Sequence, residues 1–366
     1  MDVEKYLTKS KAEFGLLIKI LGIIGFSVIL ILLAGYLFIR IRAPHMLEFS
    51  KGIVEYQVKI SLNSLDGAQF IKGMNGCENI LPVKDSSIVF VSCLDGNIHR
   101  LDYEHDGHYR IMKSYKAGEV VTGLAISADG SLFAAVCDYP IGDWTTKGGK
   151  IYRISSDLSA KEKVTGDYPS MNGICFDPDD NLYLTTSNFN YFRPEGQVLR
   201  MSKTIAGSFS QPEIYIPEAG LANGLFYDER QNLIFLSNTL DGIYDFSASE
   251  KSLNEVYLKL KFMEACDDLC TDISGNVWMT DPGMSTIKVY NPGTNRLVRF
   301  VIDGIGQTSS CRIRSEKGQK MLFITELKQS QRPTSGNYDG RGVLVVPANS
   351  LLKLLESILI NNNREQ

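Results

Sequence analysis

The sequence predicts an all-β fold, a six-bladed β-propeller of four-stranded antiparallel blades preceded by one N-terminal transmembrane helix. Short apolar strands recur at intervals of 44, 50, 51, 44 and about 43 residues. In the first five repeats, a second strand residue comes eleven residues after the polar residue that opens the first strand. A period of roughly 40–50 residues built from short strands is typical of propeller blades. An uncharged run of twenty residues precedes these repeats.

The uncharged run extends from Ile20 to Ile39 and is long enough to cross a hydrocarbon core of about 30 Å at about 1.5 Å per residue. Basic residues flank both ends, so charge alone does not decide the orientation. A cleaved signal peptide is the alternative, but the run is long for one and no clear Ala-x-Ala site follows Ala34. We therefore expect an uncleaved signal anchor with the N-terminus in the cytoplasm and the propeller outside it, in the periplasm, a lumen or the extracellular space.

The order of segments along the chain follows from this interpretation. We expect an N-terminal cytoplasmic tail at 1–15, a transmembrane anchor at 16–39, a stalk at 40–53, the propeller at 54–347, and a C-terminal helix and tail at 348–366. The alternating residues from Val54 to Ile60 are expected to add an outer strand to the last blade and so close the ring. The apolar spacing from Ser350 to Ile360 predicts a surface helix.

Composition and motifs exclude several classes of function. The net charge of −4 gives no reason to expect nucleic acid as a partner. The seven cysteines show neither a Cys-x-x-Cys pair nor a Cys/His metal spacing, and most occupy apolar strand positions, although one disulfide remains open. No Gly-x-Ser-x-Gly elbow, P-loop or Rossmann fingerprint is present. The sequence leaves the oligomeric state open.

A polar residue opens the first strand of each repeat. These residues are Glu78, Thr122, Asn172, Asn223 and Asp267, and a looser sixth copy starts at Ser309 or Ser310. In a propeller, the innermost strands all start near one end of the central axis, so residues of equal phase converge there. Carboxylate and amide oxygens are the donors that calcium prefers.

The phase therefore predicts a cation site built from Glu78, Asn172, Asn223 and Asp267. Asp268 is a further candidate ligand, although in an extended strand it would point to the opposite side from its neighbour. The alternative is that polar residues at strand starts simply bond to the turn backbone. Agreement in phase across four blades favours the cation site.

The same segments carry a family resemblance. The stretches 171–177, 222–225, 267–278 and 308–325 resemble the gluconolactonase / senescence-marker-protein family, with paraoxonase and strictosidine-synthase-like relatives. The resemblance covers roughly residues 70–347 and implies a six-bladed propeller with a divalent cation, usually calcium, at its axis. It places the family's ligands on Glu78, Asn172, Asn223 and Asp267, and the additional paraoxonase ligand on Asp268.

The resemblance also implies a chemistry, the hydrolysis of lactones or esters. In the family, the cation polarises the carbonyl and lowers the pKa of a bound water, while an aspartate accepts the proton, a role that falls here on Asp267. The chain departs from paraoxonases at Thr122, where those enzymes place a histidine. A histidine dyad is therefore not expected, and the simpler gluconolactonase chemistry fits better.

From these observations we expect a membrane-anchored, calcium-dependent hydrolase of small-molecule lactones or esters, with other divalent cations remaining open. Thr122, Trp144 and Arg193 are the candidate substrate-binding residues, the last two on long blade loops. The alternative is a non-catalytic propeller that binds a ligand or protein partner and keeps calcium for structure, because a fold does not fix a function. The substrate itself is not predicted.

Overall fold

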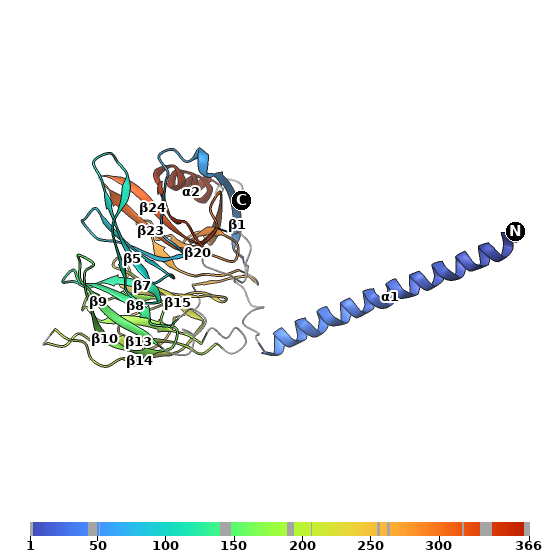
Figure 1. Ribbon diagram of the computed structural model, residues 1–366, viewed down its shortest axis with the longest axis horizontal. Helices are drawn as coiled ribbons and strands as arrows, with labels where there is room; N and C mark the ends of the chain where they lie inside the picture. The colour runs from blue at the N-terminus through green and yellow to red at the C-terminus, as the bar shows by residue number, and fades with distance from the viewer. Residues whose placement is uncertain are drawn as a thin grey trace. The chain divides into compact units, whose positions relative to one another are not determined.

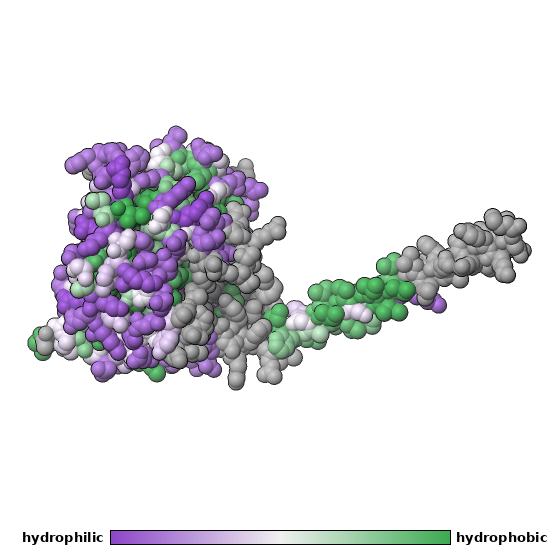
Figure 2. Space-filling view, viewed as in Figure 1, coloured by the Kyte–Doolittle hydropathy of each residue, from purple (hydrophilic) through white to green (hydrophobic). Residues whose placement is uncertain are grey.

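The computed structural model describes residues 3–42, 50, 52–139, 148–188, 194–205, 207–254, 257–261, 264–316, 318–329 and 339–361. The chain forms two compact units, Met1–Leu47 and Glu48–Gln366. The first contains helix α1 (Val3–Arg42), within which Lys19–Arg40 is long and apolar enough to cross a membrane, with a mean hydropathy of 2.6 and none of it buried. Figure 2 shows this apolar stretch of α1, whereas the visible face of the second unit is largely hydrophilic. By length and composition, the helix fits a membrane span or a signal sequence.

The second unit is a six-bladed propeller, as predicted (Figure 1). Five sheets have four strands and one has five. From the axis outward, the first three blades consist of β3 (Cys77–Pro82), β4 (Ile88–Cys93), β5 (Asn97–Tyr103) and β6 (Tyr109–Lys116); β7 (Val120–Ile126), β8 (Leu132–Cys137), β9 (Gly149–Ile154) and β10 (Lys161–Tyr168); and β11 (Ile174–Phe176), β12 (Leu182–Thr186), β13 (Gly196–Met201) and β14 (Glu213–Gly220).

The other three blades follow in the same order. They consist of β15 (Ala222–Asp228), β16 (Leu233–Asn238), β17 (Gly242–Phe246) and β18 (Leu258–Lys259); β19 (Leu269–Thr271), β20 (Val277–Asp281), β21 (Thr286–Asn291), β22 (Arg296–Asp303) and β1 (Val54–Ser61); and β23 (Gln307–Glu316), β24 (Gln319–Lys328), β25 (Gly342–Pro347) and β2 (Gln69–Lys72). The inner strands contact one another in sequence around the axis.

The ring is closed by β2, which pairs antiparallel with β25. The prediction that Val54 to Ile60 closes the last blade is wrong, because this segment lies in β1 and pairs parallel with β22 as a fifth strand of blade five. A short 3-10 turn, η2 (Leu62–Ser64), then carries the chain to β2. β2 closes the ring because it directly precedes β3 of blade one in the chain, and blade one lies next to blade six. An alternating pattern identifies a strand but not the sheet edge that it joins.

Apolar side chains fill the spaces between neighbouring blades. The described residues form six buried clusters, one at each interface between adjacent blades. The predicted C-terminal helix is present as α2 (Asn349–Asn361), and Leu351 and Leu355 pack it onto the cluster between blades five and six. Arg296 fixes the end of α2 by donating to the main-chain oxygen of Ile358 at 3.2 Å. Figure 1 shows α2 on the side of the propeller that carries β1 and β24.

A repeated aspartate turn sets the eleven-residue offset in two blades. Asp272 accepts hydrogen bonds from the main chain and side chain of Asn276, and from Trp278 Nε1 at 2.9 Å. Asp177 binds its own turn in the same way and also accepts from the hydroxyl of Tyr183. The carboxylate therefore locks the tight turn between the first and second strands and holds the aromatic residue that follows it.

Candidate metal centre and active site

The inner strands leave the ladders of their own blades at the end where the predicted site residues lie. In blade four, the pairing of β15 with β16 skips from Ala222 to Leu225, and β3, β7 and β23 have register shifts at corresponding places. The main chain bonds instead to the next blade: Gly123 N donates to Asn172 O, Gly173 N to Asn223 O and Gly224 N to Asp267 O, at 2.9, 3.0 and 3.1 Å. Residues of equal phase are therefore tied to one another.

Glycine follows each asparagine because the blades approach closely there. A Cβ atom at Gly173 would lie 2.4 Å from Asn223 O, which is closer than real Cβ contacts. A hydroxyl on the second strand fills the opening: Thr185 Oγ1 accepts from Gly173 N at 2.8 Å and donates to Asn223 O at 2.6 Å. Ser237 and Thr280 make the same pair of bonds in the next two blades. These hydroxyls fix the positions of the residues that face the axis.

Five side chains form one hydrogen-bonded chain around the axis. Ser309 Oγ lies 2.7 Å from Glu78 Oε2 and 2.6 Å from Asp267 Oδ2. The side chain of Asn172 hydrogen-bonds to Glu78, and Asn223 Nδ2 donates to Asp267 Oδ1. The structure thus brings together the four residues that the sequence singled out, and it adds Ser309. We call this group the axial cluster.

The axial cluster contains two buried carboxyl groups that have no cationic side chain as a partner among the described residues. Glu78 and Asp267 are each 8% exposed, and no Lys, Arg or His among the described residues forms an ion pair with either. Burial, reinforced by Asp267, raises the pKa of Glu78 well above its usual range. Burial raises the pKa of Asp267 to about 7, against the hydrogen bond from Ser309. Because a hydroxyl carries one hydrogen, Ser309 donates to one carboxylate and accepts from the other group only when that group is protonated.

Asp268 belongs to a second layer, formed by the residues that follow the axial cluster along the inner strands. Its Oδ2 lies 2.7 Å from Arg312 Nη1 and accepts from Asn79 Nδ2 at 3.0 Å. Ser310 donates to the same oxygen. The carboxylate of Asp268 is therefore already paired with a buried cation and lies outside the hydrogen-bonded chain of Asp267. Its role as a cation ligand stays a prediction.

Thr122 faces the neighbouring main chain. It is 3% exposed, and its hydroxyl donates to Met171 O at 3.0 Å. Blade two has Ala135 where the neighbouring blades carry the second-strand hydroxyl, so Thr122 supplies the contact between blades two and three from the inner strand. The substrate-binding role of Thr122 is not tested by this contact. Trp144 and Arg193 lie outside the described residues, and their roles also stay predictions.

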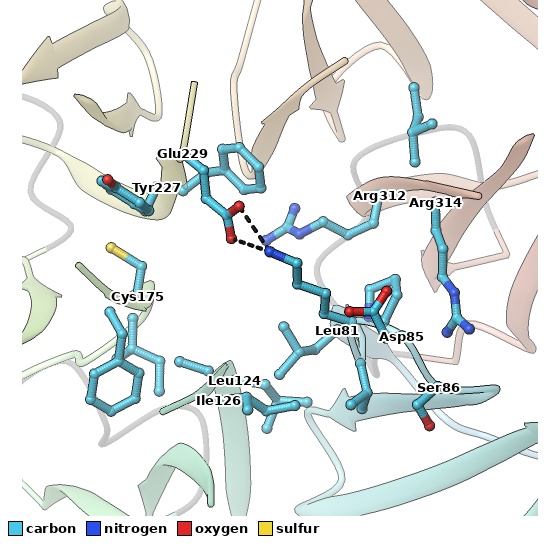
Figure 3. Close-up of a pocket in the computed structure, with 18 of the residues that line it drawn as sticks. Leu81, Asp85, Ser86, Leu124, Ile126, Cys175, Tyr227, Glu229, Arg312 and Arg314 are labelled. Carbon is cyan, nitrogen blue, oxygen red and sulfur yellow. Dashed lines mark hydrogen bonds and ion pairs between the residues drawn. The ribbon is translucent and has the colours of Figure 1, made fainter. Parts of the chain in front are cut away.

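A cavity of about 790 Å³ opens at the opposite mouth of the central channel (Figure 3). Its walls are the far ends of the inner strands, with Leu81 and Leu124 among the apolar residues. Lys84, Glu229 and Arg312 also line the cavity, and Lys84 Nζ lies 2.9 Å from Glu229 Oε2 (Figure 3). Arg312 also pairs with Asp268, so the Arg312–Asp268 ion pair lies between the cavity and the axial cluster. The two carboxyl groups without a cationic partner among the described residues, Glu78 and Asp267, lie in the axial cluster and do not line this cavity.

Comparisons with known proteins identify the family. The model of the SMP-30/Gluconolactonase/LRE-like region matches residues 83–328, more than half of the chain. The chain belongs to this family. The comparison of this chain with curated proteins found no match.

Several solved structures share the fold of this family member. One is a gluconolactonase from Xanthomonas campestris, 17% identical, with 77% of this chain and 90% of that chain covered and a TM-score of 0.54. Another is regucalcin from Agrobacterium tumefaciens, described as a calcium-binding protein, 12% identical, with coverage of 80% and 95% and a TM-score of 0.58. A luciferin-regenerating enzyme is 14% identical, with coverage of 75% and 92% and a TM-score of 0.58. At these identities, the likeness shows the fold.

The donor set of this gluconolactonase-like chain fits a hard divalent cation. Two carboxylates, two amides and a hydroxyl present oxygen atoms, which calcium takes in irregular geometry. Both described hydrogen bonds of the Asn223 side chain use Nδ2, so its oxygen Oδ1 is the atom left for a cation. The signal in the sequence for Ser309 is its phase, since it opens the sixth repeat as Glu78 opens the first. A serine attracts less attention than a carboxylate, because alone it indicates no particular chemistry.

Proposed function

We propose that this chain is a membrane-anchored, divalent-cation-dependent hydrolase of lactones or esters, with calcium as the cation and the axial cluster as its active site. The observation that carries the proposal is the pair of buried carboxyl groups, Glu78 and Asp267, joined through Ser309 without a cationic side chain. Two like charges this close need protons or a cation between them. Membership of the SMP-30/gluconolactonase-like family supports the substrate class.

Glu78, Asn172, Asn223 and Asp267 are the residues that we propose hold the cation, with Asp268 as a further candidate. When bound, the cation would supply Lewis-acid polarisation of the substrate carbonyl and make an attacking water more acidic. The bonds of Asn223 to Thr239 and Asp267 orient its side chain, so that the amide oxygen is held in place before the cation binds. Manganese, zinc and magnesium remain alternatives to calcium.

Asp267 is the group that we propose accepts the proton from the attacking water. A cation held beside Asp267 would keep its carboxylate ionised, which is the form that accepts a proton. As the water oxygen bonds to the carbonyl carbon, the proton passes to Asp267. When the ring carbon–oxygen bond then breaks, the same proton goes to the departing alkoxide. Ser309 positions Asp267 by its contact with Oδ2, and Asn223 does so at Oδ1.

The anchoring is proposed from the apolar helix. Lys19–Arg40 has the length and hydropathy of a membrane span, and we propose that it is an uncleaved signal anchor that keeps the propeller outside the cytoplasm. The domain limits given by the sequence, with the anchor at 16–39 and the propeller at 54–347, are part of this proposal.

The test is hydrolysis of a panel of lactones and aryl esters by the full-length protein in detergent micelles. We expect turnover of at least one lactone, its loss after chelation, and its recovery when calcium is added back. An active protein that is unaffected by chelation would contradict the cation's role. A protein that binds calcium tightly, with its propeller folded, but hydrolyses nothing in the panel would favour the non-catalytic ligand- or partner-binding propeller.

A further inference from the structure

A second group of metal-ligating side chains lies in blade one, and it is not part of the axial cluster. Cys93 ends β4, Asp95 lies in the following turn, and His99 lies in β5. One ligand atom from each of these three residues lies within 4.8 Å of the other two. Cys93 and His99 are buried, and Asp95 is partly buried. A sulfur, a nitrogen and a carboxylate oxygen thus converge on one point of a single hairpin.

His99 supplies the independent observation that points to a ligand. The residue is only 5% exposed, and its Nδ1 lies 2.7 Å from Ser114 Oγ on β6. Its other ring nitrogen, Nε2, is buried and has no hydrogen-bond partner. When Nδ1–H donates to Ser114, the lone pair is on Nε2, which is the tautomer that a metal binds. Buried polar atoms are usually satisfied, so the unpartnered Nε2 requires an explanation.

Cys77 provides a fourth donor from the adjacent strand. It pairs with Cys93 across β3 and β4, and the two sulfur atoms are 3.3 Å apart. This separation exceeds the roughly 2.05 Å of a disulfide bond. It is close to the distance of about 3.8 Å between two thiolates bound to one tetrahedral zinc ion at about 2.3 Å each. Cys77 lies outside the group of ligand atoms within 4.8 Å of one another and contacts it through Cys93, so its side chain must turn toward Asp95 and His99 to complete a four-ligand set.

The carboxylate of Asp95 is oriented by its turn. Its Oδ1 accepts from Asn97 N at 3.1 Å, which leaves Oδ2 for a ligand. The nearby ammonium of Lys116 donates to the main-chain oxygen of Asp95 and not to the carboxylate. The turn thus presents one carboxylate oxygen toward the cysteine and histidine side chains.

We propose that Cys77, Cys93, Asp95 and His99 form a structural binding site for a zinc-class divalent cation. Thiolate, imidazole and carboxylate are the donors of zinc sites, whereas calcium takes oxygen ligands. Four protein ligands leave no open position, so the ion holds structure and takes no part in hydrolysis. It fastens the start of β3 to the turn between β4 and β5, next to Glu78 of the axial cluster. The sequence shows no Cys/His spacing for this site because the β3–β4 ladder, and not the order of residues, brings Cys77 to it.

The test is metal titration of the reduced, metal-free, full-length protein in detergent micelles. Cobalt(II) alone is the probe, because a cobalt–thiolate bond gives a charge-transfer absorption that an oxygen-only site lacks. We expect this absorption in the unaltered protein and its disappearance when zinc(II) displaces cobalt. Cys93→Ser should abolish it, and Ser114→Ala should weaken cobalt binding by roughly the 10–100-fold typical of a lost partner of a ligating histidine.

Matched variants separate this site from its surroundings. Cys175→Ser alters a buried cysteine of blade three and should leave the cobalt spectrum unchanged, as should Asn223→Ala in the axial cluster. Asp95→Asn preserves an acceptor for Asn97 N while removing the charge, so it should fold and still bind cobalt at least about tenfold more weakly. If Cys93→Ser does not fold, His99→Gln replaces it as the variant that removes a ligand and should weaken cobalt binding. Equal absorption in Cys93→Ser and Cys175→Ser, no thiolate absorption in the unaltered protein, or a Cys77–Cys93 disulfide in the purified chain would each overturn the proposal.

Discussion

The consecutive residues Asp267 and Asp268 direct their carboxylates to different partners in the central channel. Asp267 Oδ2 lies 2.6 Å from Ser309 Oγ in the axial cluster, whereas Asp268 Oδ2 lies 2.7 Å from Arg312 Nη1 in the layer beyond it. One carboxylate is therefore compensated by a buried guanidinium, and the other has no cationic partner among the described residues. This difference supports the proposal that Asp267 holds the cation and accepts a proton, and it shows that Asp268 takes part in charge balance within the fold.

Loss of a single donor should weaken cation binding according to its charge. Asn223→Ala removes a neutral oxygen and should lower calcium affinity by at least about tenfold. Glu78→Ala also removes a negative charge and should lower it further. Isothermal titration with calcium measures both. Affinities equal to that of the unaltered protein in both variants would show that the axial cluster is not the calcium site.

Calcium affinity should rise with pH through neutrality. Burial raises the pKa of Asp267 to about 7 and the pKa of Glu78 well above its usual range, so protons compete with the cation for both carboxylates below that pH. Titrations from pH 5.5 to 8.5 in non-coordinating buffers, roughly the window about the Asp267 pKa, should show protons released on binding. A pH-independent affinity would exclude this competition.

The same shifts predict the sign of the stability change in the metal-free protein. Asp267 keeps its proton in the folded state up to its pKa of about 7, whereas in the unfolded chain it loses the proton near its ordinary pKa of 3.8. The folded state therefore binds more protons between these values, and stability falls as pH rises through that window. Thermal unfolding in chelator should show this decrease, and Asp267→Asn should reduce it.

The ion pair of Asp268 with Arg312 should be costly to break from one side. Asp268→Ala leaves a buried guanidinium without its carboxylate and should lower the free energy of unfolding by about 3–5 kcal/mol. The exposed Lys84–Glu229 pair is the control, since Lys84→Ala should change stability by no more than about 1 kcal/mol. Denaturant unfolding of the full-length variants compares the two. Similar small effects would mean that the buried pair is not needed for charge balance.

The proposed topology places the C-terminus outside the cytoplasm. A reporter that is active only after export, fused after Gln366, should be active, and a reporter that requires the cytoplasm should be silent. The opposite pattern would reverse the orientation. Release of the propeller from the membrane fraction with a shortened N-terminus would indicate a cleaved signal peptide.

The sequence predicted the blades better than their edges. The eleven-residue offset reflects turns such as the one locked by Asp272, and local turns are readable from local residues. The phase of Glu78 and Asn223 predicted convergence because all inner strands start at one end of the axis. The parallel pairing of β1 with β22 was missed, because it depends on which sheet edge is free and near in space.

The partners of the site residues were less predictable than their positions. Alternation suggested that Asp268 faces away from Asp267, but no local pattern links it to Arg312, which is 44 residues further along the chain. Ser309 gained its importance only from its contacts with two carboxyl groups. The proximity of Cys93 to both Cys77 and His99 likewise arises from strand pairing across a blade. Such relationships depend on the assembled propeller.

The central claim is tested most directly by Asp267→Asn, with hydrolysis rate and calcium content measured side by side in the full-length protein. The substitution keeps an oxygen donor but removes the basic carboxylate. We predict that much of the calcium is retained and that turnover falls by roughly the 10²–10⁴-fold typical of a lost acid–base group. Thr122→Val should change turnover far less, because its hydroxyl bonds to the main chain. Near-normal turnover in Asp267→Asn with calcium bound would contradict the account.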